Sequence, residues 1–188
     1  HHLFANNYPQ NLREIVSNSA FEFNLDVKPQ WFPIIGGTIA DLKKRAPGNR
    51  LLEVGVGSGE MTAVAKEYLF DVTGIDIRPT YAENISRVLN VPIHSVDFQL
   101  FETEQLFDVI CMGDVIEHMA DPVAAIKKAS QLLNHNGVLW ISTPNFDSAF
   151  SMVMKDRDPM WRIIEHLNYF SFRSLKATLE ANHFEVVD

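Results

Sequence analysis

The sequence is poor in cysteine, in basic residues and in long apolar runs, and each shortage excludes a class of protein. Its one cysteine, Cys111, lies within an apolar segment. A disulfide framework is therefore excluded, and we expect a small buried residue rather than a nucleophile or metal ligand. No apolar run reaches the roughly 18 residues of a membrane span. These shortages favour a compact protein of the reducing cytoplasm.

The shortage of basic residues bears on partners. Lysine and arginine number 16 against 24 aspartates and glutamates, which gives a net charge of −8. Nucleic-acid binding depends on neutralising phosphates with lysine and arginine, so we expect no nucleic-acid partner. The histidines and acids also lack the HExxH or CxxC spacing typical of metal sites, so the sequence predicts no metal centre.

The order of apolar segments indicates the fold class. With 188 residues, 46% of them hydrophobic, the chain can bury one sizeable core. Strand-like and helical segments alternate along it, a pattern typical of a parallel sheet with helices on both faces. We therefore predict a doubly wound, Rossmann-like α/β fold with a mostly parallel sheet.

The most informative segment is Leu51–Gly59, a short apolar strand that runs into three alternating glycines, Gly55, Gly57 and Gly59. A backbone without side chains is required by a tight turn or by a ligand that approaches closely. The helix that follows offers free N–H groups at its first turn. Two acids sharpen the signal. Glu53 lies inside the strand, and Asp76 ends the next strand about twenty residues after the first glycine. An acid at that spacing usually binds ribose hydroxyls.

A nicotinamide or flavin dinucleotide site is the nearest competing interpretation. Its G-x-G-x-x-G fingerprint requires a small residue where this chain has Glu60. A pyrophosphate there would meet the carboxylates of Glu53 and Glu60, and like charges at a partly buried site are costly. The loop is better suited to a ligand with a ribose and a positive charge, and S-adenosylmethionine has both.

These residues resemble the class I S-adenosylmethionine-dependent methyltransferases, whose first motif is an acid followed by Gly-x-Gly-x-Gly. The resemblance extends over roughly residues 45 to 188, and the later motifs follow in the expected order. The matching segments are Gly74–Asp76, Val96–Phe98, Phe107–His118 and Asn136–Asn145. The last of them is similar to the small-molecule branch that includes ubiquinone-biosynthesis O-methyltransferases and sugar methyltransferases.

The resemblance implies S-adenosylmethionine as cofactor. It also implies that Asp76 accepts hydrogen bonds from the ribose hydroxyls and that Asp97 holds the adenine amino group. The full implied set of cofactor-binding residues is Glu53, Gly55, Val56, Gly57, Gly59, Asp76, Ile77, Asp97, Phe98, Gly113 and Asp114.

The first 46 residues are expected to form an N-terminal helical segment, and residues 47–188 the cofactor-binding domain. Apolar residues from Trp31 to Leu42 recur at three- and four-residue spacing, which predicts a helix, and Pro47-Gly48 ends it. In the family such a segment packs over the cofactor as a lid. A plain helix that covers the sheet is the alternative.

Further elements follow in the second half. Asp121-Pro122 begins a helix, and Val138–Ile141 is typical of a strand buried on both faces. A helix over Phe172–Ala181 and a strand over Phe184–Val187 come last. The seventh, antiparallel strand that the family usually has is missing from this sequence.

Residues 144–170 are predicted to form an insertion around the methyl acceptor, because the usual connection has only about 2–6 residues. Its aromatic and methionine side chains are expected to line a pocket, although a surface helix whose apolar residues merely pack down is the alternative. His118, after the fourth strand, and His166, in the insertion, are candidate catalytic bases. Structural roles for both histidines remain open.

We therefore predict methyl transfer to a small-molecule acceptor, with oxygen as the favoured acceptor atom. Two other classes stay open. One is a non-methylating enzyme on the same fold, such as an aminopropyl transferase, for which Asp114 and Glu117 would supply the acids. The other is a non-catalytic cofactor-binding subunit. The sequence leaves open the identity of the acceptor and the oligomeric state.

Overall fold

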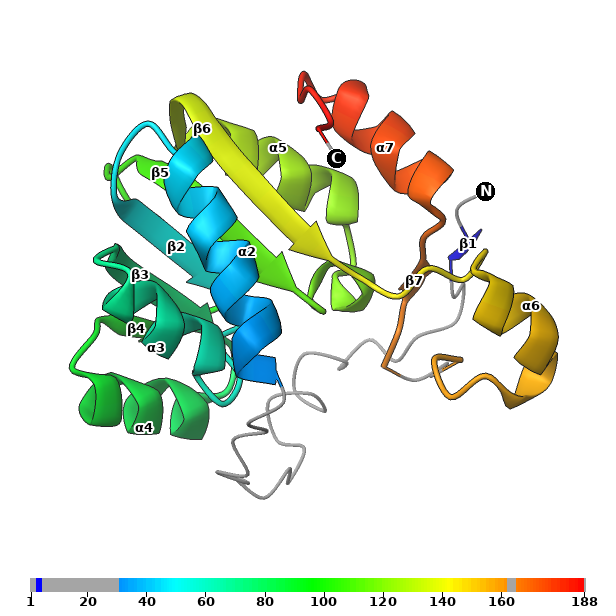
Figure 1. Ribbon diagram of the computed structural model, residues 1–188, viewed down its shortest axis with the longest axis horizontal. Helices are drawn as coiled ribbons and strands as arrows, with labels where there is room; N and C mark the ends of the chain where they lie inside the picture. The colour runs from blue at the N-terminus through cyan, green and yellow to red at the C-terminus, as the bar shows by residue number, and fades with distance from the viewer. Residues whose placement is uncertain (1–2, 5–30, 162–164, 188) are drawn as a thin grey trace.

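A computed structural model describes residues 3–4, 31–161 and 165–187 of the chain. Its centre is a sheet of five parallel strands in the order β4-β3-β2-β5-β6 (Figure 1). The chain winds outward from β2 to β4 and then returns to the centre as β5, which confirms the predicted doubly wound α/β fold. The strands are β2 (Arg50–Val54), β3 (Asp71–Asp76), β4 (Ile93–Ser95), β5 (Phe107–Gly113) and β6 (Leu133–Ser142).

Helices cover both faces of this sheet. In Figure 1, α2 and α3 lie in front of it and α5 lies behind it. Asp121 caps α5 by accepting a hydrogen bond from the Ala124 amide at 2.9 Å, as its place before Pro122 predicted. The helices are α2 (Phe32–Arg45), α3 (Glu60–Glu67), α4 (Pro79–Leu89), α5 (Pro122–Leu132) and α7 (Phe172–Glu180), and the short 3-10 turns η2 (Phe98–Leu100) and η3 (Ile116–His118) follow β4 and β5.

Consecutive residues of the central strands pack on opposite faces. Leu51 packs with Ile39 of α2, whereas Leu52 packs with Ala125 of α5. All four side chains are fully buried, and a buried leucine contributes about 1.5–3 kcal/mol. Because both faces are covered, β2 and β5 are largely apolar and do not alternate between apolar and polar residues, although β2 contains Glu53 and β5 contains Asp108. Cys111 of β5 is likewise fully buried, which confirms its expected place in the core.

Strand β6 lies at the edge of the sheet and packs against core clusters on both faces, but it is only partly buried, so the prediction of a strand buried on both faces holds in part. It pairs with β5 on one side, and among the described residues no strand pairs with its other side. Residues 138–141 are consequently only half-buried. The strand also begins earlier than predicted, at Leu133, with an irregular step in register opposite Phe107 and Val109.

The strand predicted over Phe184–Val187 is not formed. After α7 the chain turns back on the helix, and the Phe184 amide donates to the Leu179 carbonyl at 3.1 Å. The Phe184 side chain packs against the cluster that joins α5 and α7. The hydrogen bond from the Phe184 amide satisfies the Leu179 carbonyl in the last turn of the helix. Within the described residues, the main sheet therefore has neither a sixth nor a seventh strand, in line with the expected lack of a seventh.

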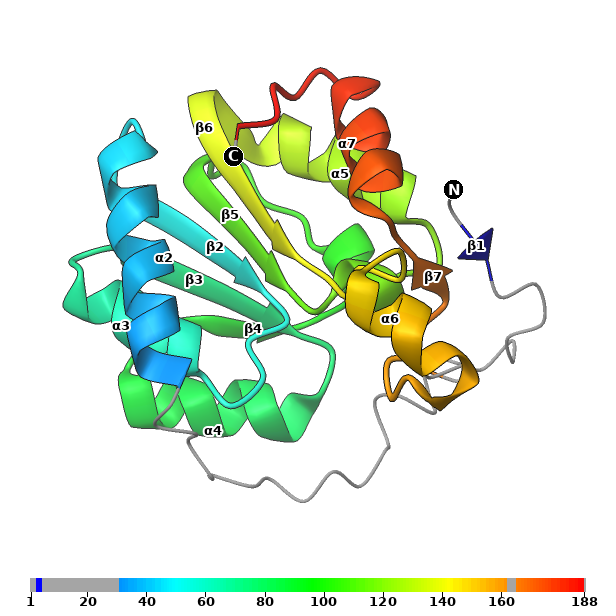
Figure 2. The ribbon, with the colours of Figure 1, turned by 45° about the vertical axis from the view of Figure 1, so that its right-hand side comes forward.

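The connection after β6 is the long excursion that the sequence predicted. It contains α6 (Ala149–Met154), the 3-10 turn η4 (Lys155–Arg157) and β7 (Asn168–Tyr169), and a bridge between Asn145 and Phe170 joins its two ends. Strand β7 pairs with β1 (Leu3–Phe4), so N-terminal residues reach this excursion (Figure 2). Most of the predicted lid, residues 5–30, lies outside the described residues, and its role stays a prediction.

Helix α2 runs through Gly36 and Gly37 without interruption, and its buried residues Ile39 and Leu42 hold it on the sheet. None of the helices in the described part of the chain combines the length and apolar character that a membrane crossing requires.

Candidate cofactor and acceptor site

The candidate site lies where the order of strands reverses, at the carboxyl ends of β2 and β5. The loops after these strands meet there: a Cβ built on Gly55 would lie 2.4 Å from the Val115 side chain. In open α/β sheets, ligands bind in the crevice beside such a reversal. The glycine loop and the segment after β5 are therefore brought together as the resemblance implied.

The three glycines of the loop all have positive φ, at +77°, +55° and +85° for Gly55, Gly57 and Gly59, which favours glycine at each. Their surroundings differ. Side chains crowd Gly55 and Gly59, whereas a Cβ on Gly57 would have nothing within 4 Å. The first and third glycines thus serve the packing of the turn, and Gly57 lies beside open space that a bound cofactor can fill.

Asp76 ends β3 next to this space and is only 2% exposed. Its Oδ2 accepts a hydrogen bond from the Gly57 amide at 3.0 Å, which ties β3 to the glycine loop. The Arg78 guanidinium also contacts both carboxylate oxygens. Asp76 therefore presents a buried carboxylate at the place where the sequence predicts the ribose.

Glu53 is buried inside β2, where its Oε2 accepts a hydrogen bond from the Thr62 hydroxyl. Burial raises the pKa of Glu53 to about 8; the Thr62 bond opposes the rise, and the charges of Glu60 and Asp76 add to it. The carboxyl group is thus largely neutral at pH 7. A cation placed beside it would favour the ionised form.

The remaining predicted cofactor residues occupy the ends of β3, β4 and β5. The Asp97 carboxylate accepts a hydrogen bond from the Gln99 amide at 2.8 Å and so caps η2. Phe98 is part of the hydrophobic core, at 3% exposure. Asp114 is exposed, and its backbone has a left-handed conformation with φ of +51°. Val56 is buried, and Ile77 and Gly113 are half-buried. Cofactor contacts by this group stay predictions.

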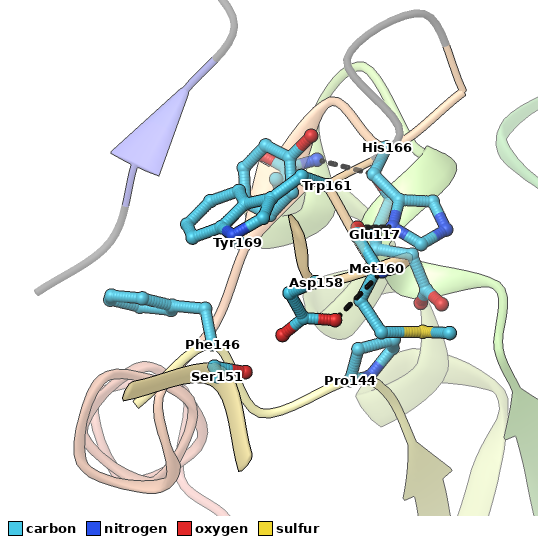
Figure 3. A pocket seen from close by; sticks show the side chains of 10 residues that line it. Glu117, Pro144, Phe146, Ser151, Asp158, Met160, Trp161, His166 and Tyr169 are labelled. Carbon is cyan, nitrogen blue, oxygen red and sulfur yellow. Dashed lines mark hydrogen bonds between the residues drawn. The ribbon is translucent and has the colours of Figure 1, made fainter. Parts of the chain in front are cut away.

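A small cavity of about 10 Å³ lies between η3 and the insertion, which is room for roughly one water. In Figure 3, Phe146, Trp161 and Tyr169 stand on one side of it, and Glu117 and His166 on the other. The Trp161 and Tyr169 rings pack 4.9 Å apart. The predicted pocket lining is thus confirmed for Phe146, Trp161 and the cavity residue Met160, but Phe150 and Met152 of α6 are largely exposed.

Glu117 is the most unusual side chain of this cavity, and the sequence analysis did not place it in the candidate site. It is 1% exposed, and its Oε2 accepts a hydrogen bond from the Thr143 hydroxyl at 2.9 Å. Its Oε1 is buried with no hydrogen-bond partner among the described residues. Burial raises the pKa of Glu117 to about 7, the Thr143 bond opposes the rise, and the charge of Asp114 adds to it.

Both predicted histidines lie beside Glu117. The His118 Nδ1 is 2.7 Å from the Glu165 carbonyl, and the His166 Nδ1 is 3.0 Å from the Met160 carbonyl. A carbonyl oxygen only accepts hydrogen bonds, so each Nδ1 carries a hydrogen and each Nε2 is the basic atom of the neutral ring. The two rings meet edge to face with centroids 4.8 Å apart.

These three residues also form a possible cation site. Glu117, His118 and His166 each offer one ligand atom, and these atoms lie within 4.8 Å of one another. The sequence contains no closely spaced ligand motif of the HExxH or CxxC kind. The grouping arises instead because the insertion returns to η3, a tertiary contact that no local spacing could indicate.

The insertion is held in this position by Asn168, a second residue that the sequence analysis missed. Its side-chain amide donates to the Met119 carbonyl at 2.6 Å, and the Leu167 amide donates to the Glu117 carbonyl at 2.8 Å. Asn168 is 1% exposed. Only its position just before an apolar pair in the sequence could have drawn attention to it.

Comparison with known proteins assigns this site to a family. A family model described as "Methyltransferase domain" matches residues 33–188, which is most of the chain. The chain belongs to this methyltransferase family. This membership, with the motifs around Gly57 and Asp76, makes it a class I S-adenosylmethionine-dependent methyltransferase domain. S-adenosylmethionine is the cofactor of that class, and its contacts with Gly57 and Asp76 stay predictions.

A ubiquinone biosynthesis O-methyltransferase of Xanthomonas campestris pv. campestris is similar to this methyltransferase, at 28% identity over 127 residues. The match covers 63% of the chain and 53% of the relative, so the chain spans about half the length of that curated protein.

Two solved structures share the fold. A Burkholderia thailandensis 1,6-didemethyltoxoflavin-N1-methyltransferase, solved with bound 1,6-didemethyltoxoflavin and S-adenosylhomocysteine, matches with a TM-score of 0.71 at 17% identity; the match covers 94% of the chain and 77% of that protein. The [4+2]-cyclase SpnF matches with a TM-score of 0.64 at 22% identity, over 81% of the chain and 58% of that protein. The shared fold thus hosts more than one reaction, and the acceptor chemistry must be argued from the site.

Proposed function

We propose that this methyltransferase transfers the methyl group of S-adenosylmethionine to a hydroxyl oxygen of a small-molecule acceptor. The observation that carries the proposal is the group of buried Glu117, buried His166 and the more exposed His118, which lies beside the aromatic rings of Trp161 and Tyr169. A hydroxyl acceptor must lose a proton as it is methylated, and this group supplies atoms that can take it. The likeness to ubiquinone biosynthesis O-methyltransferases supports oxygen as the acceptor atom.

The cofactor side of the proposal assigns each residue a task. Asp76 accepts hydrogen bonds from the ribose, the bare backbone at Gly57 lets the cofactor approach, and Glu53 faces its cationic end. When bound, S-adenosylmethionine supplies a methyl group already activated by a positively charged sulfur. The protein's main contribution is therefore to align the acceptor oxygen behind that methyl and to exclude water.

The acceptor side depends on the basic atoms around Glu117. Because each Nδ1 hydrogen is directed at a carbonyl, Nε2 is the atom of each neutral ring that can take up a proton. The Glu117 Oε1 lies 4.0 Å from the His118 Nε2. We propose that the acceptor hydroxyl binds against this group and that its proton passes to it. The rings of Phe146, Trp161 and Tyr169 favour a flat or apolar acceptor body.

The cavity as it stands holds roughly one water, so the acceptor requires more space. We propose that the insertion of residues 144–170 opens for the acceptor and closes over it. The N-terminal segment would take part as a lid, because β1 pairs with β7 inside the region that must move. Closure of this kind would also exclude water from the reaction.

A methyl-transfer assay on the purified chain tests the proposal. The chain is incubated with S-adenosylmethionine and, separately, with a small phenol, a sugar and an aromatic amine, and mass spectrometry follows S-adenosylhomocysteine and methylated product. We expect an O-methylated product and no reaction with the amine. An N-methylated product would overturn the choice of oxygen.

The two alternatives predict other results in the same assay. An aminopropyl transferase would consume decarboxylated S-adenosylmethionine in the presence of a polyamine. A non-catalytic subunit would bind S-adenosylhomocysteine but give no product with any acceptor. Acceptors extracted with the protein from its host and identified by mass spectrometry would extend the panel to natural candidates.

A further inference from the structure

The carboxylate of Asp76 already has a full set of hydrogen-bond donors. Its Oδ2 accepts from the Gly57 amide at 3.0 Å and from the Arg78 Nη2 at 2.8 Å. Its Oδ1 accepts from the Arg78 amide and from the Arg78 Nε, both at 2.9 Å. An ionised carboxylate offers about four lone-pair positions. All four are therefore engaged, two of them by the guanidinium of a single residue.

The Tyr81 ring also holds the Arg78 side chain in position beside Asp76. Its guanidinium carbon lies 3.7 Å from the centroid of the Tyr81 ring, a stacking contact with the first turn of α4. Pro79 begins that helix, and Arg78 itself is extended, with φ of −94° and ψ of 110°. The backbone thus directs both the amide and the side chain of Arg78 back toward Asp76. The contact is a fork of two parallel bonds to a carboxylate that is 2% exposed.

A ribose presents the same pattern of donors. Its two neighbouring hydroxyls form a pair that would bind the two oxygens of one carboxylate, and the Arg78 fork occupies both of them. The backbone amides of Gly57 and Arg78 belong to the loop and the strand end, so they can stay. The guanidinium is the only one of the described donors on Asp76 that a side-chain rotation can remove.

We propose that Arg78 is an internal competitor for the ribose position: it pairs with Asp76 in the cofactor-free protein, turns away when the cofactor binds, and returns as the product nucleoside leaves. This inference rests on the proposed assignment of Asp76 to the ribose. The guanidinium keeps the buried carboxylate paired when no ligand is present, which avoids an uncompensated buried charge. The same contact lowers cofactor affinity and speeds product release, because every binding event must break it.

Calorimetric titration with S-adenosylhomocysteine tests the competition. Salt weakens the Arg78–Asp76 pair and also screens Glu53 from the ammonium group of this ligand, but the second effect is common to wild type and the Arg78 variants. We expect Arg78→Ala to bind the ligand about 5- to 50-fold more tightly, which is the range expected for losing a competing charge-assisted bond pair. The affinity of wild type relative to that of Arg78→Ala should rise with ionic strength as the ion pair is screened.

Arg87→Ala is the matched control. Arg87 lies in α4, the helix that begins directly after Arg78, and its guanidinium contacts Asn84 on the exposed surface, so we expect wild-type affinity and salt dependence. Stopped-flow displacement should show slower release of S-adenosylhomocysteine from Arg78→Ala. Without ligand, that variant should melt at a lower temperature than wild type, and its gain in melting temperature on adding ligand should be larger. Arg78→Gln, which keeps the stem of the side chain, serves as a second variant if the alanine variant folds poorly.

Two outcomes would overturn the inference, and they differ from failure of the proposed function. If wild type binds S-adenosylhomocysteine and the Arg78 variants bind it equally or more weakly, Arg78 is a spectator or a ligand contact rather than a competitor. If Asp76→Ala binds as tightly as wild type, Asp76 does not hold the ribose and there is nothing to compete for. Failure of the proposed function would appear instead as no binding by wild type, or as binding without methyl transfer to any acceptor.

Discussion

At the scale of single residues, Glu117 presents one bonded and one unbonded carboxylate oxygen to the cavity. The bonded Oε2 fixes its orientation through Thr143, and the buried Oε1 faces His118. A group with a pKa of about 7 is well matched to accepting a proton near neutral pH. If the protein donated hydrogen bonds to both oxygens of Glu117, neither oxygen could readily take up a proton from the acceptor.

We therefore expect the rate of methyl transfer to a hydroxyl acceptor to rise with pH and to level off above about pH 7, as Glu117 ionises. Glu117→Gln should lower turnover by about 10²–10⁴ and remove this pH dependence, with unchanged affinity for S-adenosylhomocysteine. His118→Ala and His166→Ala, singly and together, separate the histidine contribution from that of Glu117. Kinetics over pH 5.5 to about 9 measure all of these effects.

Thr143→Val provides the control for this prediction. The variant removes the hydrogen bond that opposes the rise in the pKa of Glu117, so the pH profile should move to higher pH while turnover at high pH is kept. A Glu117→Gln variant with wild-type turnover and an unaltered profile would assign Glu117 to structure alone.

Glu53 carries a different prediction, because its pKa is raised from 4.5 to about 8 by burial inside β2. Between these values the folded protein holds a proton that the unfolded chain releases. The stability due to this proton is fully present below about pH 4.5 and is lost as pH rises to about 8, by at most about 1.4 kcal/mol per pH unit. Glu53→Gln cannot ionise, so its melting temperature should exceed that of wild type increasingly from pH 5 to 8.

The same residue should make cofactor binding depend on pH in the opposite sense. If Glu53 faces the cationic end of the cofactor, it must ionise on binding, so affinity should increase from pH 6 to 8 by up to about tenfold per unit. Glu53→Gln should bind weakly and without this dependence. Thermal melts and calorimetry on the same samples separate the two effects. Equal pH dependence in both proteins would place the proton elsewhere.

At the scale of elements, the buried side-chain amide of Asn168 is one of the contacts that hold the insertion beside η3. The Asn168 side chain bonds the Met119 carbonyl, and no charged pair of the described residues joins β7 to η3. Asn168→Ala would remove this hydrogen bond from the part-buried Met119 carbonyl, at a cost of up to about 1–3 kcal/mol. We expect faster limited proteolysis within residues 144–170 and a loss of methyl transfer, with little change in binding of S-adenosylhomocysteine.

Asn84→Ala is a suitable comparison, because Asn84 bonds only its helix neighbour Arg87 in the contacts described here. It should show wild-type proteolysis. Proteolysis of Asn168→Ala at the wild-type rate would indicate that the bridge between Asn145 and Phe170 is enough to hold the insertion.

The elements also show where sequence patterns are informative. β2 and α3 could be predicted because neighbouring residues determine them. β2 is a largely apolar strand buried on both faces, and the turn before α3 has a backbone conformation that favours glycine. β6 has the same apolar composition but lies at an edge, and nothing within residues 138–141 distinguishes the two situations. The Phe184–Val187 segment has strand-like residues, yet a helix-end hydrogen bond and packing of Phe184 decide its conformation.

The two halves of the candidate site differ in the same way in how far the sequence predicts them. Its cofactor half is built from residues next to strand ends, so motif spacing located Gly57 and Asp76 directly. Its acceptor half is assembled by the return of the insertion to η3, a contact between residues distant in the sequence. For that reason the sequence indicated Glu117 only as an acid for the alternative aminopropyl transferase, and gave Asn168 no role. Arg78 was overlooked because an arginine after a strand is usually a solvated surface residue.

At the scale of the whole molecule, a bound cofactor would contact the ends of three strands that are far apart in the sequence. The glycine loop follows β2, Asp76 ends β3, and Asp114 follows β5 on the other side of the reversal point. A ligand that contacts all three binds the folded state and not the unfolded chain, so it must raise the stability of the entire domain.

The size of this effect can be predicted. At a free concentration of S-adenosylhomocysteine 100 times its dissociation constant, the stabilisation is about 2.7 kcal/mol. For a domain of this length that corresponds to a rise in melting temperature of roughly 5–11 °C. NAD at the same concentration should give no shift, because Glu60 stands where the dinucleotide fingerprint needs a small residue, and its carboxylate would meet the pyrophosphate. Asp76→Ala should bind S-adenosylhomocysteine about tenfold to several hundredfold more weakly, which would reduce the shift to half or less. A shift with NAD but none with S-adenosylhomocysteine, measured by differential scanning calorimetry, would contradict the assignment of the cofactor site.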